Sequence, residues 1–121
     1  MVVDDVQVNL EVAQAILESF NLEVIHVENA KKAIELFTNS PNYFDLIFMD
    51  LQMPEIDGLQ ATKIIRNLNI PNAPVIPIVA MTANIFKDDI EQCIKAGMNG
   101  HLGKPIDVSE IAKLLAKTFH I

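Results

Sequence analysis

Short runs of hydrophobic residues alternate along the chain with segments of helical periodicity. Runs such as 46–49 and 78–81 are apolar at consecutive positions, which is typical of strands that are covered on both faces. The runs are residues 1–3, 23–27, 46–49 and 77–81, followed by a weaker one near His101. Between them, apolar residues recur every three or four positions, as in a helix with one buried face. The pattern predicts a chain of alternating β and α elements.

Several residues mark where these elements should begin and end. Asn29 precedes the second helical segment and can cap it, while Gly97 follows the fourth segment. Ser109 and Glu110 are expected to open the fifth helix. Pro77 can take the first position of its strand, where the missing N–H costs least. Together, the apolar runs and the helical segments predict a parallel sheet with helices on both faces, which is a fold of the α/β class.

Composition limits the kinds of partner that we expect. The chain has 121 residues, which fits one domain, and a formal net charge of −7 with only nine lysines and arginines. This charge argues against direct binding of nucleic acid. The single cysteine, Cys93, has no disulfide partner and is expected in the core of a cytoplasmic domain. We expect neither a signal peptide nor a membrane contact, because no apolar run is long enough.

Polar residues follow the predicted strands at the point where each strand ends. Asp4 and Asp5 follow the first run, Asp50 ends the third, Thr82 follows the fourth and Lys104 follows the weak fifth run. Each residue alone could be a turn or surface residue. In an open parallel sheet, however, the carboxyl ends of the strands form the ligand-binding edge. Their occurrence at successive strand ends therefore favours a shared site.

The chemistry of these side chains indicates a metal and a phosphoryl group. Clustered carboxylates repel one another, and Mg²⁺ is a hard cation that prefers oxygen ligands. A carboxylate beside such an ion can act as a nucleophile toward phosphorus. A lysine ammonium and a hydroxyl could neutralise or contact the oxygens of the transferred group. The set is therefore suited to Mg²⁺-dependent phosphoryl transfer.

Four motifs resemble the receiver domain of two-component response regulators. They are VVDD at 2–5, MDLQMPEIDG at 49–58, MTAN at 81–84 and GKPI at 103–106. The second and third motifs are most similar to receivers attached to hybrid sensor histidine kinases. The resemblance covers essentially the whole chain, so we expect a single receiver domain over 1–121. It implies a (βα)5 flavodoxin-like three-layer sandwich with a five-stranded parallel sheet of order 2-1-3-4-5.

The resemblance also implies a phosphoacceptor and its metal ligands. Asp50 would accept a phosphoryl group from a phosphohistidine on a histidine kinase or a histidine phosphotransfer domain. Asp5 and Asp50 would bind Mg²⁺ through their side chains, and Asp4 would act mainly through a bound water. Gln52 would offer its backbone carbonyl to the ion. Such a domain catalyses its own phosphorylation and dephosphorylation.

Other residues have supporting roles by the same resemblance. Lys104 would contact the phosphoryl oxygens and precede a cis bond to Pro105. Thr82 would turn toward the phosphoryl group and signal its arrival, by a conformational change or before onward transfer. Asp57 and Gly58 would form a structural turn before the third helix.

Two departures from the family pattern affect these expectations. His101 stands where Tyr or Phe is usual, so the aromatic movement coupled to the hydroxyl residue is in doubt, and a partly exposed polar role is expected. Val6 stands where a polar residue is common, and the first strand is short. We therefore expect a fragment of a longer protein, which could include an output domain or a membrane anchor outside this domain.

Three other classes of protein share parts of this pattern. A haloacid-dehalogenase-type phosphatase carries a second acid two residues after its nucleophile, where this chain has Gln52. A flavodoxin-like flavin protein needs a phosphate-binding first β–α loop, whereas residues 4–9 read DDVQVN. A receiver that serves only as a binding module would lack an acid or the lysine, and here none is missing. The phosphoacceptor receiver fits best.

Overall fold

The computed structural model describes residues 1–83 and 87–120, with the backbone alone for 87 and 88. In this part of the chain five parallel strands form one sheet of order β2-β1-β3-β4-β5, as expected for a flavodoxin-like α/β sandwich. The strands are β1 (Val2–Val3), β2 (His26–Val27), β3 (Ile47–Asp50), β4 (Ile78–Thr82) and β5 (Gly100–Gly103). The helices are α1 (Gln7–Glu18), α2 (Ala30–Asn39), α3 (Gly58–Arg66), α4 (Lys87–Ala96) and α5 (Val108–Phe119), with a 3-10 turn η1 (Pro41–Tyr43).

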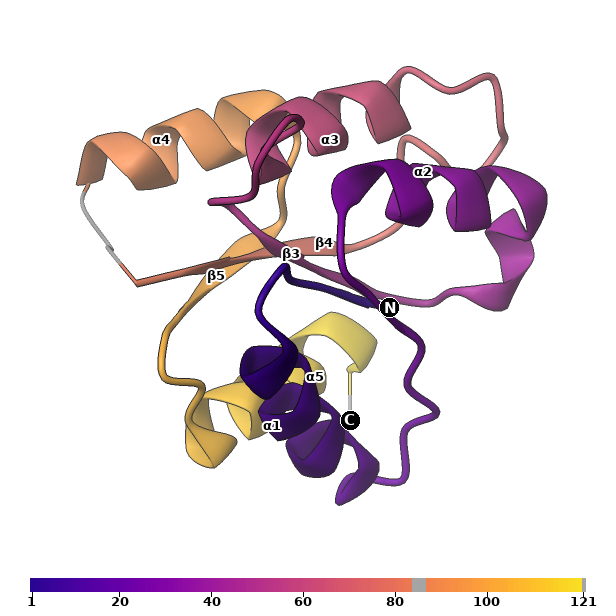
Figure 1. Ribbon diagram of the computed structural model, residues 1–121. Coiled ribbons are helices and arrows are strands. Elements are labelled where there is room, and N and C mark those ends of the chain that lie inside the picture. The colour runs from indigo at the N-terminus through magenta and orange to yellow at the C-terminus, as the bar shows by residue number, and fades with distance from the viewer. Residues whose placement is uncertain (84–86, 121) are drawn as a thin grey trace.

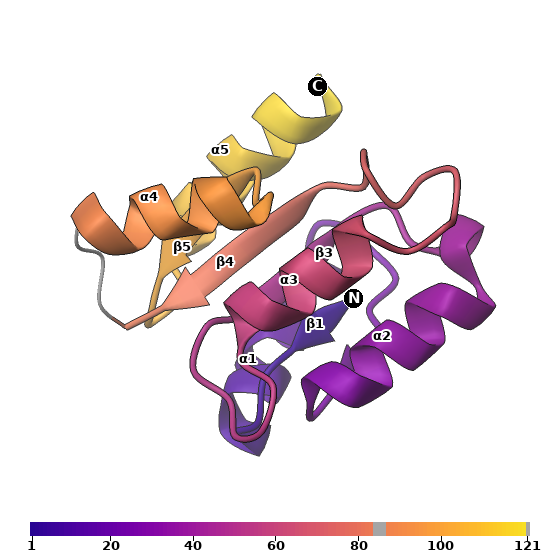
Figure 2. The ribbon, with the colours of Figure 1, turned by 90° about the horizontal axis from the view of Figure 1, so that it is seen from above.

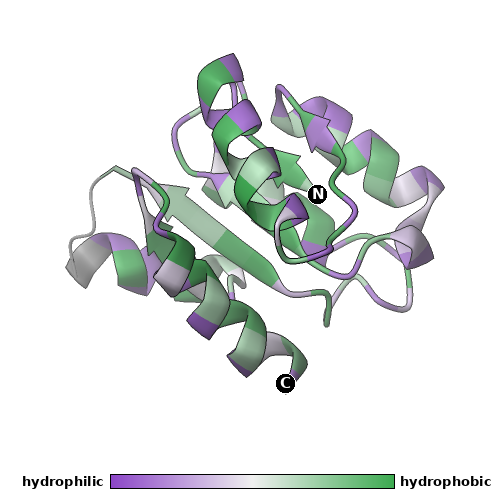
Figure 3. Ribbon diagram, turned by 90° about the horizontal axis from the view of Figure 1, so that it is seen from below, coloured by the Kyte–Doolittle hydropathy of each residue, from purple (hydrophilic) through white to green (hydrophobic). Residues whose placement is uncertain are grey.

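The sheet lies between two layers of helices. Helices α2, α3 and α4 cover one face, and α1 and α5 cover the other (Figures 1 and 2). Successive residues of β3 alternate between the two cores, because Ile47 and Met49 pack toward α2 and α3 while Phe48 packs toward α1 and α5. Figure 3 shows strands that are hydrophobic over most of their length and helices of mixed character. Burial on both faces explains the consecutive apolar positions in the sequence.

The observed ends of the helices and strands agree with those predicted from the sequence, except for α5 and for two strands. The Asn29 side chain accepts a backbone N–H of α2 at 2.8 Å, and Gly97 follows α4 with φ +106°, a conformation that favours glycine. Helix α5 begins at Val108, one residue before the expected Ser109, and is capped by Asp107, whose carboxylate accepts the backbone N–H of Ser109 at 2.7 Å. The extended backbone of Asp107 allows its side chain to reach back over the first turn.

Strand β2 is shorter than its apolar run, and β4 is shifted by one residue relative to its run. Strand β2 covers only the last two residues of the run 23–27, and β4 begins at Ile78, one residue after Pro77. The Pro77 carbonyl still accepts a hydrogen bond from the Ile47 N–H at 2.9 Å. The proline therefore contributes its acceptor to the sheet although it lies just outside the strand.

Arg66 at the end of α3 joins three separate segments of the chain. Its Nε donates to the Gly97 carbonyl at 2.9 Å, Nη1 to the Ala73 carbonyl at 2.8 Å and Nη2 to Asn99 Oδ1 at 2.8 Å. Asn99 Oδ1 also accepts the N–H of Ile78 at 2.9 Å. One guanidinium thus fixes the loops before β4 and before β5, at the end of the sheet opposite the strand ends that carry the acids.

Replacing Arg66 with Met should destabilise the domain by about 3 kcal/mol, because three charge-assisted hydrogen bonds are lost. Methionine keeps the apolar stem, so the loss reports on the guanidinium. The matched control is Lys63→Met, an exposed change on the same helix. Urea unfolding should give a much smaller effect for the control, and equal effects would show that Arg66 does not hold these segments together.

Candidate functional site

The acids predicted from the strand ends lie together at the carboxyl edge of the sheet. Asp4 directly follows β1, and Asp50 is the last residue of the neighbouring strand β3. Both are buried, with 1% and 3% of their surface exposed, whereas Asp5 is exposed. One carboxylate oxygen from each of the three aspartates lies within 4.8 Å of the others. The structure therefore brings these three predicted residues together.

Lys104 lies between the two buried carboxylates. Its Nζ is 2.9 Å from Asp4 Oδ2 and 3.1 Å from Asp50 Oδ1. The backbone places the side chain there, because the Lys104 N–H donates to the carbonyl of Thr82 at 2.8 Å. The bond from Lys104 to Pro105 is cis, as the sequence motif implies. The lysine and the buried acids thus form one ionic cluster from three strands of the sheet.

The loop after β3 holds Asp50 in place. The Gln52 N–H donates to Asp50 Oδ1 at 3.2 Å, so the structure places Gln52 beside the cluster, while its carbonyl stays only a predicted ligand. A Cβ on Gly58 would lie 2.2 Å from the carbonyl oxygen of Asp50, so only glycine allows α3 to start this close to the strand end. Asp57 and Gln60 form a capping box at that start. The expected structural role of Asp57 and Gly58 agrees with this geometry.

Thr82 and its neighbours complete this edge of the sheet. Thr82 is the last residue of β4 and is buried, with 6% of its surface exposed. The pairing of β4 with β5 places Thr82 opposite Gly103, one residue before Lys104. The last residue of the MTAN motif, Asn84, lies outside the described residues. Thr82 is therefore where the sequence predicts it, next to the strand that carries the lysine.

The burial of these charges alters their proton affinities. Burial raises the pKa of Asp50 above its ordinary 3.8, and the charge of Asp4 raises it further against the opposing effect of Lys104. Burial would lower the pKa of Lys104, but its close contacts with the negatively charged Asp4 and Asp50 carboxylates outweigh this and raise the pKa above 10.5. The lysine therefore stays protonated, while ionised Asp50 costs folding free energy.

We expect that cost to appear as a pH dependence of stability in the presence of a chelator. Below pH 3.8 the Asp50 carboxyl is protonated in both the folded and unfolded chains and contributes nothing. As pH rises through the raised pKa, the folded chain resists ionisation and loses stability. Asp50→Asn removes this loss, so the variant should be more stable than wild type at neutral pH by about 1 kcal/mol.

The measurement is urea unfolding of both proteins from acid to neutral pH with chelator present. The stability difference should be smallest in acid and grow with pH. A variant that is less stable than wild type at neutral pH would show that Lys104 more than offsets the cost of ionised Asp50.

The cluster has the donor set of a divalent-cation site. Asp4 Oδ1 accepts the Val6 N–H at 2.9 Å, but the contact of Oδ2 with Lys104 is an ion pair without hydrogen-bond geometry. Buried Oδ2 therefore makes no hydrogen bond in the described structure beyond its charge contact with Lys104. Unsatisfied carboxylate oxygens next to exposed Asp5 suit a hard cation such as Mg²⁺. The residues present therefore fit a Mg²⁺ ion.

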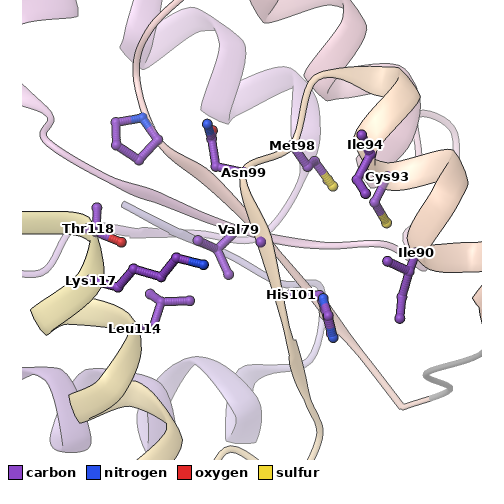
Figure 4. A pocket seen from close by; sticks show the side chains of 12 residues that line it. Val79, Ile90, Cys93, Ile94, Met98, Asn99, His101, Leu114, Lys117 and Thr118 are labelled. Atoms are coloured by element: carbon purple, nitrogen blue, oxygen red, sulfur yellow. The ribbon is translucent and has the colours of Figure 1, made fainter.

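His101 lies away from this cluster. It is exposed on β5, as expected, and lines a cavity of about 550 Å³ between α4, β5 and α5 (Figure 4). Cys93, on the sheet side of α4, lines the same cavity and is buried, and burial raises the pKa of its thiol. None of the acids or Lys104 lines this cavity. The cavity is therefore separate from the ionic cluster.

One polar contact of the cluster was not predicted from the sequence. The Asn9 amide, in the first turn of α1, donates from Nδ2 to Asp4 Oδ1 at 3.5 Å. The sequence offered only an asparagine five residues after the first acid as a signal. Whether its side chain reaches Asp4 depends on the path of the chain from β1 into α1. Asn9 is therefore an addition to the predicted set.

A family model and the curated relatives place this chain in the same family. The family model described as the response regulator receiver domain matches residues 1–116. Probable histidine kinase 6 of Oryza sativa subsp. japonica is 35% identical over 133 residues, and Histidine kinase 3 of Arabidopsis thaliana is 35% identical over 138 residues. These alignments cover 97% and 99% of this chain but only 14% and 13% of the relatives. The chain thus spans a small part of the curated relatives it matches.

Solved structures agree with the sequence relatives. The receiver domain of a sensor histidine kinase from Pseudomonas aeruginosa PAO1, with a magnesium ion coordinated in the active site cleft, matches with a TM-score of 0.85 and 34% identity, covering 99% of this chain and 95% of that one. A chain in the co-crystal structure of the Saccharomyces cerevisiae histidine phosphotransfer protein Ypd1 and the receiver domain of Ssk1 matches with a TM-score of 0.85 and 26% identity, covering 96% and 84%.

The fold, the acidic cluster and the comparisons agree with one another. Receiver domains bind Mg²⁺ at an acidic site, and this chain has a cluster of aspartates at the corresponding edge of its sheet. None of the described helices has both the length and the apolar character needed to cross a membrane. The chain belongs to the response regulator receiver domain family and is a receiver domain of two-component signal transduction.

Proposed function

We propose that Asp50 of this receiver accepts a phosphoryl group from a phosphohistidine in a phosphorelay. The observation that carries this assignment is the position of Lys104, within 3.1 Å of Asp50 in a buried cluster of acids. An Asp50 oxygen attacks phosphorus, the bond from phosphorus to the histidine nitrogen breaks, and the imidazole leaves. The donor is a histidine kinase or a histidine phosphotransfer domain, a proposal supported by the similarity to a chain in the Ypd1 complex.

We further propose that Mg²⁺ binds at the side chains of Asp4, Asp5 and Asp50 and at the carbonyl of Gln52. The ion supplies positive charge that neutralises the oxygens of the transferred group. Lys104 supplies a second positive charge, since its ammonium already faces the Asp50 carboxylate. The magnesium ion in the Pseudomonas aeruginosa receiver supports this assignment.

Thr82 has a different role in this proposal. Its hydroxyl contacts the phosphoryl group and thereby changes the conformation at the end of β4, next to the β5 segment that leads into Lys104. The signal then passes by this conformational change or by onward transfer of the phosphoryl group. The parent protein is a longer cytoplasmic or membrane-anchored signalling protein, with a kinase core or an output domain in the same chain.

Incubation with Mg²⁺ and acetyl phosphate tests the central step without a partner protein. The domain should gain the mass of one phosphoryl group, and the group should be stable in acid and labile in base, as an acyl phosphate is. Chelation of Mg²⁺ should prevent the gain, because Lys104 alone offsets only part of the negative charge. Labelling that is equal with and without chelator would reject the proposed Mg²⁺-dependent site.

A further inference from the structure

We propose that Asn9 is a positioning residue that orients Asp4 for Mg²⁺, an inference that rests on the proposed function. Asn9 lies in the first turn of α1 and is half-buried. Its Nδ2 donates to Oδ1 of Asp4 at 3.5 Å. Among the polar side chains of α1, it is the one with a hydrogen bond to the acidic cluster in the described structure.

The two oxygens of Asp4 have different surroundings. Oδ1 accepts two donors, the Val6 N–H at 2.9 Å and the Asn9 amide. Oδ2 has no hydrogen bond and faces Lys104 across the buried cluster. A half-turn of the carboxylate only exchanges two equivalent oxygens, whereas rotation out of its present plane would take the accepting oxygen away from both donors. The donors therefore keep Oδ2 directed into the cluster, where a cation would interact with it.

The start of α1 explains why a side chain is needed to hold the Asp4 carboxylate in its orientation. The N-cap position is occupied by Val6, which has no side-chain acceptor or donor. The Asp4 carboxylate is therefore tied to the helix by one backbone N–H and by the Asn9 amide alone. Side chains that hold a metal-binding group in its orientation commonly affect metal affinity about tenfold or more when they are removed.

A structural role would give a different result from a positioning role. If Asn9 only stabilised the start of α1, its loss would lower the stability of the metal-free domain and leave Mg²⁺ affinity unchanged. Alanine and leucine both have higher helix propensity than asparagine, so Asn9→Ala and Asn9→Leu should fold. Leucine keeps the branched shape of the side chain and replaces the oxygen and nitrogen of its amide with methyl groups.

The experiment is a series of thermal melts in chelator and at increasing Mg²⁺ concentration, from which linkage gives the dissociation constant. Both variants should bind Mg²⁺ about tenfold more weakly than wild type, with melting temperatures in chelator close to that of wild type. The matched control is Gln7→Ala, an exposed change in the same turn whose side-chain amide donates to Glu11 at 3.5 Å. The control should bind Mg²⁺ as wild type does.

The outcomes separate this inference from the proposed function. Wild-type affinity in Asn9→Ala or Asn9→Leu overturns the positioning role and leaves the proposed site intact. If Gln7→Ala weakens Mg²⁺ binding equally, the positioning role is also overturned, because the effect would then come from the helix rather than from the Asn9 amide. Failure of the wild-type domain to respond to Mg²⁺ overturns the proposed site, and the positioning role with it.

Discussion

Asp50→Asn should abolish labelling by acetyl phosphate, because the amide that replaces the carboxylate is not a nucleophile toward phosphorus. Neither of the other two acids is placed to replace it. Asp4 is buried and tied through Oδ1 to the start of α1, and Asp5 is exposed and makes no ion pair with Lys104 in the described structure. Asp50 combines contact with the lysine and a position at the end of the central strand β3.

A matched control separates the loss of the nucleophile from a general effect on the strand. Asp45 is exposed and precedes the opposite end of β3, so Asp45→Asn makes the same chemical change away from the cluster. Intact-mass spectrometry should show one added phosphoryl group in wild type and Asp45→Asn and none in Asp50→Asn. Full labelling of Asp50→Asn would mean that another residue is the acceptor.

Lys104→Ala should lower the rate of labelling by about 100-fold, the typical loss when one charge-stabilising donor is removed from a transition state. The lysine is within 2.9 Å of Asp4 and 3.1 Å of Asp50, so its removal leaves two buried carboxylates without a compensating cation. The transferred phosphoryl group adds further negative charge at the same place. A folded variant should therefore bind Mg²⁺ but transfer the group slowly.

Two other variants test whether the loss of labelling rate is specific to Lys104. Lys113→Ala removes an exposed lysine from α5 and should label as wild type does. Thr82→Ala should also label nearly as wild type does, because the proposed role of this hydroxyl follows phosphorylation rather than assisting it. The rate is measured by stopping samples at intervals and determining the phosphorylated fraction by mass. Equal loss in Lys104→Ala and Thr82→Ala would mean that both residues act in the chemical step.

The site residues that could be predicted from the sequence are those marked by a local signal. An apolar run that stops at Asp50 marks the carboxyl end of a strand, and Thr82 follows the next run in the same way. A parallel sheet then brings such ends together whatever the details of packing. The strand order was implied by the resemblance of the four motifs to the receiver family, and the structure has that order.

Features that depend on packing between distant segments could not be predicted. The acceptors Gly97 and Asn99 lie 31 and 33 residues from Arg66, and nothing in the local sequence pairs them. Gly58 was expected as a turn residue, but the close approach of α3 to the Asp50 carbonyl is what requires glycine there. The contact of Asn9 with Asp4 depends in the same way on the path from β1 into α1.

The position of the phosphoryl group in the wild-type domain tests the central claim most directly. After labelling with acetyl phosphate and Mg²⁺, borohydride reduces an aspartyl phosphate to homoserine, which peptide mass spectrometry can locate after digestion. The account predicts homoserine at position 50 only, and none when Mg²⁺ is removed before labelling. Homoserine at position 4 or 5, or a phosphoryl group on a side chain outside the cluster, would contradict it.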